Sequence, residues 1–398
     1  MDMPVEKTWN TDEFTNVAGA LNWQAQRQPG ATAIYYPKSG ALKKGRYESC
    51  TYQELNELSE TYARGLLEYG IGPGTRTALM LTPGLDFFAM FFALFKAGAV
   101  PVLIDPGIGM KPLKQCLAEA APTAFIGVTK AHFARKILGW AKESCELMVS
   151  AGPTFGLGGI NLKKIRELGD LSSQEVLHPV KPDDMAAILF TSGSTGVPKG
   201  VVYRHRHFNA QVQMLREAFD IQPGEVSLPT FPPFALFDPA LGMTTVVPIM
   251  DPTRPAEADP EKLVEVINQF KVTNIFGSPA LLNTLSRYCV DNKIRLESVT
   301  RVISAGAAVP VRTIRRMQDS LYRDAEIHTP YGATECLPVS SISATELDDD
   351  MVDRIESGEG VCVGKPVQPN KVRVIKISDM AFNDISETTE MPFGMPGE

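Results

Sequence analysis

From about residue 76 onward, short apolar runs alternate with longer amphipathic runs, and this alternation constrains the fold more than any other feature. Such a rhythm is typical of βαβ units, in which a helix connects two parallel strands. Strands that are apolar along their whole length are buried on both faces, so we expect mostly parallel sheets with helices on both faces. Ligands of such folds bind at the carboxyl ends of the strands. The apolar runs that we assign to strands include RTALML (76–81), VPVLI (100–104), DMAAILF (184–190), VTNIFG (272–277) and VTRVISAG (299–306).

The length of 398 residues allows two or three domains. A glycine-rich stretch at 152–159 and the polar run LSSQEVLHPVKPDD (171–184) lie between two series of βα units. After Pro338 the sequence becomes polar and acidic. The subdomains that we expect are a first α/β subdomain over 1–165, a second one with the ligand site over 166–340, and the start of a smaller β-rich part over 341–398.

Charge and composition exclude several classes of protein. The 39 Lys and Arg against 46 Asp and Glu give a net charge of −7, without long runs of one sign, which argues against nucleic-acid binding. The apolar run FFAMFFALF (87–95) has about half the length of a membrane span, so it predicts a buried helix. The amino terminus has no secretory signal pattern, and we expect a cytoplasmic protein. The cysteines and histidines show no zinc-binding spacing, and we expect His205 and His207 to be basic residues that are either solvated or on the phosphate side.

The densest motif is LFTSGSTGVPKG, at residues 189–200. A buried strand runs into six residues that are all Thr, Ser or Gly, and these let main-chain N–H groups and hydroxyls surround an anion such as a polyphosphate. A flexible linker is the alternative, but linkers rarely follow a buried strand directly. Pro198 before Lys199 rules out the Walker spacing of kinases and GTPases. The candidate phosphate-binding residues are Thr191, Ser192, Gly193, Ser194, Thr195, Gly196 and Lys199.

Residues 189–200 resemble the phosphate-loop signature of the AMP-forming acyl-adenylating superfamily, which contains acyl-CoA synthetases, adenylation domains and luciferases. TPYGATECLP (329–338) is similar to the second signature of that superfamily. The resemblance implies that Tyr331 stacks on adenine, Thr334 contacts the phosphates and Glu335 helps to hold Mg²⁺. It also implies ATP as the co-substrate. The catalytic residues that it implies are Lys199, Thr334 and Glu335, with Glu335 as the metal ligand.

Two further segments resemble binding segments of the same superfamily. SAGAAVP (304–310) is similar to the small-residue segment on which adenine rests. LPTFPPFALFDPALG (228–242) resembles the acyl-pocket segment, with Ala235 where many members have a histidine or an aromatic gate. The remaining nucleotide-binding residues implied are Gly306, Ala307, Ala308, Thr329, Tyr331, Gly332 and Thr334. The substrate-binding residues implied are Phe234, Ala235, Phe237, Asp238, Gly277, Ser278 and Ala305.

Within the superfamily the sequence most resembles the olefin β-lactone synthetases. These enzymes activate a 2-alkyl-3-hydroxy fatty acid and close it to a β-lactone, so the resemblance implies a small hydrophobic acid as substrate and other hydrocarbon-biosynthesis enzymes as partners. A fatty-acid CoA ligase, which would also use coenzyme A, is one alternative, and a non-catalytic nucleotide-binding scaffold is another. Members of the superfamily continue into a lid domain, and we expect this chain to be the large amino-terminal body without it.

Overall fold

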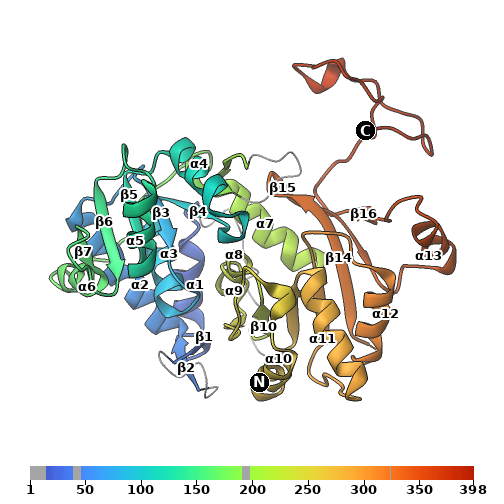
Figure 1. Cartoon of the computed structure of the whole chain (residues 1–398), viewed down its shortest axis with the longest axis horizontal. Coiled ribbons are helices and arrows are strands. Elements are labelled where there is room, and N and C mark those ends of the chain that lie inside the picture. The colour runs from blue at the N-terminus through green and yellow to red at the C-terminus, as the bar shows by residue number, and fades with distance from the viewer. Residues whose placement is uncertain (1–14, 39–45, 191–197, 323) are drawn as a thin grey trace.

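The computed structural model describes residues 15–38, 46–190, 198–322 and 324–398. Two mostly parallel β-sheets lie side by side, and helices cover both faces of each (Figure 1). This arrangement confirms the α/β fold expected from the alternation of strands and helices.

The first sheet has seven strands in the order β7-β6-β5-β3-β4-β8-β9, and its neighbours are parallel except for β8 and β9. Helices α2 (Tyr52–Tyr69), α3 (Leu85–Lys96) and α6 (Leu162–Gly169) pack on one face. The other face is covered by α4 (Met110–Ala120) and α5 (Thr129–Leu138). The strand bounds are β3 (Arg76–Met80), β4 (Val100–Ile104), β5 (Ala124–Val128), β6 (Leu147–Ala151), β7 (Ile160–Asn161), β8 (Met185–Phe190) and β9 (Val201–Arg204).

The second sheet has nine strands in the order β16-β15-β14-β13-β12-β10-β11-β1-β2, and it is antiparallel only where β2, β15 and β16 join it. Helices α10 (Pro260–Phe270), α11 (Pro279–Asp291) and α12 (Val311–Asp319) cover one face, and α1 (Gly19–Arg27), α7 (His205–Ala218) and α9 (Asp238–Leu241) cover the other. The strand bounds are β1 (Thr32–Pro37), β2 (Tyr47–Thr51), β10 (Val226–Pro229), β11 (Thr244–Val246), β12 (Asn274–Gly277), β13 (Arg301–Ser304), β14 (Glu326–Ala333), β15 (Cys336–Ser343) and β16 (Lys365–Pro366).

Each of the two sheets contains strands from both sides of residue 165, where we expected a subdomain boundary. Strands β1 and β2, from the amino-terminal part of the chain, lie at one edge of the second sheet, where β1 pairs with β11. Strands β8 and β9, which follow residue 165, complete the first sheet beside β4. Membership of a sheet therefore does not follow the order of the chain.

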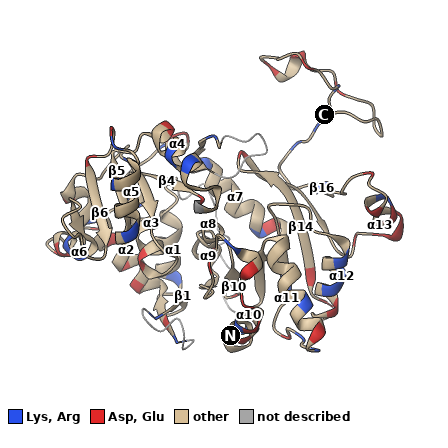
Figure 2. Cartoon of the chain, in the orientation of Figure 1, with Lys and Arg blue, Asp and Glu red and all other residues tan. Residues whose placement is uncertain are grey.

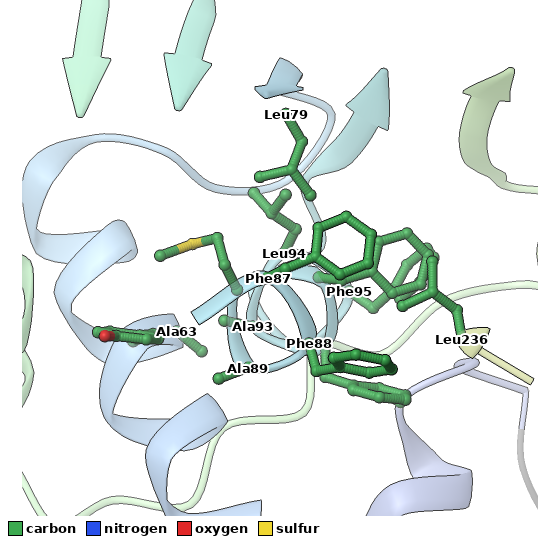
Figure 3. Close-up of a cluster of buried hydrophobic side chains, with 14 of the residues drawn as sticks. Ala63, Leu79, Phe87, Phe88, Ala89, Ala93, Leu94, Phe95 and Leu236 are labelled. Carbon is green, nitrogen blue, oxygen red and sulfur yellow. The ribbon is translucent and has the colours of Figure 1, made fainter. Parts of the chain in front are cut away.

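Helix α3 fills the space between the two sheets, and every side chain from Phe87 to Lys96 is buried. Figure 3 shows Phe87, Phe88 and Phe95 of this helix in a cluster that also includes Leu236, which follows the short helix α8 (Pro232–Ala235). The predicted buried helix at 87–95 is thereby confirmed. Within the described part of the chain, no helix is both long enough and apolar enough to cross a membrane.

The carboxyl-terminal residues project away from the body of the molecule (Figure 1). They include α13 (Asp349–Glu356) and the one-turn helix η4 (Ile385–Glu387). A single antiparallel bridge joins Ile375 to Glu390. The β structure expected over 341–398 therefore consists of the end of β15, the short edge strand β16 and this bridge.

Candidate nucleotide and acyl site

The hairpin of β14 and β15 carries the second signature motif. A β-bulge interrupts the register between Tyr331 and Ala333. At Gly332 a Cβ atom would lie 2.8 Å from the carbonyl oxygen of Cys336, so the close approach of the two strands requires glycine there. The bulge leaves Tyr331 56% exposed and places Glu335, also exposed, at the tip of the hairpin. Both side chains can therefore reach a ligand.

Two hydrogen bonds fasten this hairpin to the segment that follows the phosphate-loop motif. The hydroxyl of Tyr203, on β9, donates to the carbonyl oxygen of Thr334 at 2.5 Å. The amide of Gln211, on α7, donates to the carbonyl oxygen of Leu337 at 3.0 Å. Because Tyr203 comes four residues after Lys199, the structure brings the two signature motifs together.

At the end of the phosphate-loop motif, Lys199 is exposed and Gly200 is half-buried. A Cβ atom on Gly200 would lie 2.7 Å from Cζ of Phe190, and its N–H donates to Oε1 of Glu119 on α4 at 3.2 Å. These contacts fix the backbone on which Lys199 stands. The loop residues Thr191, Ser192, Gly193, Ser194, Thr195 and Gly196 lie outside the described residues, so their assignment stays a prediction.

The small-residue segment leaves the carboxyl end of β13 and lies on the surface. Gly306 has a φ of +96°, a left-handed conformation that favours glycine, and no atom would lie within 4 Å of an added Cβ. Ala307 and Ala308 are exposed and Ala305 is half-buried. Since β13 and β14 are parallel neighbours, this segment and Tyr331 lie at the same edge of the sheet. Thr329, also on β14, is half-buried and donates to the carbonyl oxygen of Ile342 at 3.5 Å.

The acyl-pocket segment forms α8 and α9 and borders two apolar cavities. The ring of Phe234 stacks on Phe276 with centroids 4.0 Å apart. The first cavity, of about 20 Å³, is lined by Phe88 from α3 and by Ala235. The second, of about 10 Å³, is lined by Phe237, Leu236 and side chains of α3 and α7. Each has the volume of about one water molecule, so an acyl chain could enter only if side chains rotated.

Not every predicted substrate-binding residue lines these cavities. Ala235 lines the first and Phe237 the second, whereas Gly277, Ser278 and Ala305 line neither. Ser278 is the N-cap of α11, where its hydroxyl accepts a hydrogen bond from the N–H of Leu281 at 3.3 Å. Gly277 is buried at the end of β12.

Asp238 is buried and also lines neither cavity. Its carboxyl group accepts a hydrogen bond from the hydroxyl of Thr245 at 3.0 Å. Burial raises the pKa of Asp238 to about 7, although hydrogen bonds from Thr245 and Ser227 act in the opposite direction. Within the acyl-pocket segment, the Asp238 carboxyl group thus links α9 to β11 through Thr245.

The raised pKa predicts that the stability of the protein depends on pH through Asp238. The folded state holds this proton more tightly than the unfolded state, where the pKa is near 3.8. The resulting stabilisation is complete below about pH 4 and is lost as the pH rises through 7, a change of up to about 4 kcal/mol. In Asp238→Asn this loss should be absent. Denaturant unfolding of both proteins at about pH 5 and pH 8 tests this, and equal pH dependence would contradict it.

His205 corrects one expectation from the sequence. It is buried rather than solvated, and its Nδ1 accepts a hydrogen bond from the N–H of Val17 at 3.3 Å. Burial lowers the pKa of this imidazole to about 4, so it is neutral at physiological pH. His207, on the same helix, is half-buried, and its Nδ1 accepts from the N–H of Arg204 at 3.2 Å.

Tyr203, Gln211 and Glu119 are the residues that sequence reasoning missed. All three act through backbone groups of the signature motifs, and their partners are 131, 126 and 81 residues away in the chain. The position of these residues in the sequence does not indicate which distant backbone groups they contact.

The site has few groups of its own for a metal ion. Among the residues that the structure describes, no three or more His, Cys, Asp and Glu side chains gather where they could hold one. Magnesium at nucleotide sites is often held by only one or two carboxylates, with phosphate oxygens and waters completing the shell. The single exposed carboxylate of Glu335 fits that arrangement.

This combination of fold and site defines a class of enzyme, the AMP-forming ligases, which activate an acid with ATP. The sequence matches the family described as AMP-binding enzyme over residues 21–398, and the chain belongs to that family.

Curated relatives and solved structures agree with this membership. The chain is 49% identical over 385 residues to an olefin β-lactone synthetase of Xanthomonas campestris pv. campestris, a match that covers 96% of this chain and 68% of that protein. It is also 49% identical to an olefin β-lactone synthetase of Stenotrophomonas maltophilia, covering 96% and 69%. The crystal structure of a long-chain fatty-acid CoA ligase from Archaeoglobus fulgidus has the same fold, with a TM-score of 0.75, 20% identity and coverage of 96% and 73%.

Proposed function

We propose that this enzyme activates a 2-alkyl-3-hydroxy fatty acid with ATP and closes the product to a β-lactone. The observation that carries the proposal is the 49% identity to two olefin β-lactone synthetases over 96% of this chain. A 2-alkyl-3-hydroxy acid has two hydrocarbon branches. The acyl-pocket segment borders two apolar cavities, each of about the volume of one water molecule, which rotation of side chains would have to enlarge to admit them.

Helix α7 contacts both the second cavity and the hairpin that carries the second signature motif. Phe208 and Val212 of this helix line the second cavity. Gln211, between them in sequence, donates to the hairpin that carries Thr334 and Glu335. One helix therefore positions an apolar wall and a polar hairpin, which is what a substrate with hydrocarbon branches and a carboxylate requires.

In the first step a carboxylate oxygen attacks the α-phosphorus of ATP, an acyl–phosphate bond forms, and pyrophosphate leaves. Such transfers depend on positioning and on neutralising the charge of the leaving group. Lys199 and Mg²⁺ held with Glu335 would offset that charge. Thr334 would contact the phosphates, and Tyr331 with the 306–308 segment would hold the adenine.

In the second step the 3-hydroxyl oxygen attacks the activated carbonyl carbon, the hydroxyl proton is lost, and AMP leaves. Both reacting groups belong to one molecule, so the attack has the rate advantage of an intramolecular reaction. A CoA ligase would admit an external thiol at this point instead.

Product analysis with and without coenzyme A tests the proposal. With ATP, Mg²⁺ and a 2-alkyl-3-hydroxy acid, we expect AMP, pyrophosphate and a β-lactone, detected by nuclear magnetic resonance, whether or not coenzyme A is present. A matched 2-alkyl acid without the hydroxyl should be adenylated and yield no lactone. A thioester product that requires coenzyme A would overturn lactone formation, and the absence of pyrophosphate release would favour a non-catalytic scaffold.

A further inference from the structure

One face of the molecule, formed by α4, α5 and the loop that holds Phe155, combines exposed apolar side chains with lysines. We call it the α4–α5 face. Its apolar members are Ile137, Phe155, Met110 and Phe133, which are 79%, 70%, 54% and 42% exposed. The rings of Phe133 and Phe155 lie 6.3 Å apart. Its lysines are Lys111, Lys114, Lys130, Lys136 and Lys142, all exposed.

The pattern of helix α5 explains why these side chains point outward. His132 is buried and its Nε2 lies 2.9 Å from the carbonyl oxygen of Val149, which fixes the inner side of the helix. Lys130, Phe133 and Ile137, spaced three and four residues apart, share one outer stripe. The solvent stripe of a surface helix is normally polar. Here two of its three positions are large and apolar, and both side chains are exposed.

Helices α4 and α5 contribute to the same face. Side chains of both pack on one apolar cluster with Trp140 and Phe125. The ammonium group of Lys114 on α4 would be 3.8 Å from a Cβ on Gly139, the residue that ends α5. A lysine of α4 therefore reaches the carboxyl end of α5, whose outer side carries the apolar side chains.

This face has an excess of basic side chains in an acidic protein (Figure 2). Residues 105–146 contain six Lys and Arg and four Asp and Glu, whereas the whole chain has a net charge of −7. Among the described residues, none of the five lysines takes part in an ion pair. Arg135 turns inward, over the ring of Phe125. Among the acids, Glu119 accepts a hydrogen bond from the N–H of Gly200 at the carboxyl end of α4.

We propose that the α4–α5 face binds an anionic lipid surface. Lysine clusters are attracted to anionic headgroups, and exposed apolar side chains between them can enter the boundary between headgroups and acyl chains. Neither feature alone would hold the protein there, but the two act together. The inference goes beyond the proposed function, because it concerns where the enzyme works. Through Glu119 and Gly200 the face adjoins the phosphate-loop motif, so an enzyme bound in this way would have its site close to a membrane.

Vesicle co-sedimentation of the purified protein tests the proposal. We expect binding to vesicles of phosphatidylcholine with about one third phosphatidylglycerol, and weaker binding to phosphatidylcholine alone. The Lys130→Glu/Lys136→Glu variant should lose about tenfold or more in partitioning at low salt. The Ile137→Ser/Phe155→Ser variant should lose about tenfold, including at about 0.5 M salt, where charges are screened. Circular dichroism and thermal unfolding verify that each variant is folded.

The matched control is Arg312→Glu/Arg315→Glu on α12. These arginines are exposed and unpaired among the described residues, and the substitution changes the net charge equally on a different helix. It should leave binding within about twofold of the parent protein. Equal losses in the control and the lysine variant, or no preference of the parent protein for anionic vesicles, would overturn the proposal. So would a dimer that Ile137→Ser/Phe155→Ser converts to a monomer in light scattering, because the face would then join two copies of the chain.

Discussion

The Glu335→Gln variant should form acyl-adenylate at least about a hundredfold more slowly than the parent protein. Glutamine keeps the size and the exposed position of Glu335 at the tip of the β14–β15 hairpin but removes its charge. Because no cluster of acidic or metal-binding side chains elsewhere in the described chain could replace it, the Mg²⁺ that accompanies ATP would lose its protein ligand. Acid-dependent exchange of pyrophosphate into ATP measures the effect.

Glu356→Gln on α13 is the matched control for this prediction. Glu356 is also exposed, and its helix is separate from the hairpin (Figure 1). The control variant should exchange pyrophosphate at the parental rate. For Glu335→Gln we also expect a higher magnesium concentration at half-maximal rate. An unchanged rate and magnesium dependence would show that Glu335 is not the metal ligand.

The Ala235→Trp variant should discriminate against long acids. Ala235 is buried and lines the first cavity beside Phe88, so an indole there would occupy the space into which an acyl chain must pass. We expect kcat/KM for a long-chain acid to fall by about a hundredfold relative to that for a short acid of two to four carbons. Pyrophosphate exchange with both acids, measured on the same preparation, gives this ratio directly.

Overpacking by the indole costs about 1–3 kcal/mol of stability, so the thermal midpoint has to be measured as well. Ala235→Val, a smaller enlargement at the same position, should give an intermediate ratio. If both acids lose activity equally while the protein remains folded, Ala235 does not border the acyl path. That result would also remove the support that the first cavity gives to a fatty substrate.

Local sequence patterns predicted the features that depend on neighbouring residues. The run of Phe and Ala at 87–95 is too apolar for any surface, and it forms the buried part of α3. The alternation of apolar and amphipathic runs after residue 76 predicted strands joined by helices, and β3, α3 and β4 follow it. In both cases the physical cause lies within a few residues, so the pattern alone carries the information.

Contacts between distant segments could not be predicted in this way. His205 looks like a surface residue beside two arginines, yet residues near the amino terminus cover it, and Val17 donates to its ring. Tyr203 gives no sign in sequence that its hydroxyl binds the backbone of Thr334. Likewise, nothing in the run at 32–37 says that it joins the second sheet rather than the first. These outcomes depend on how the whole chain packs.

The pairing of an early strand with a late strand in the second sheet has a consequence for the synthesis of the protein. In the sheet Ile34 of β1 lies opposite Thr245 of β11, more than two hundred residues later in the chain. At about 5–20 residues per second, the ribosome needs roughly 10–40 s to make the intervening chain. During that interval the inner edge of β1 has no strand to pair with, so its backbone N–H and C=O groups stay available to chaperones or to other nascent chains. The amino-terminal strands are thus synthesised first and are among the last to complete their pairing in the sheet.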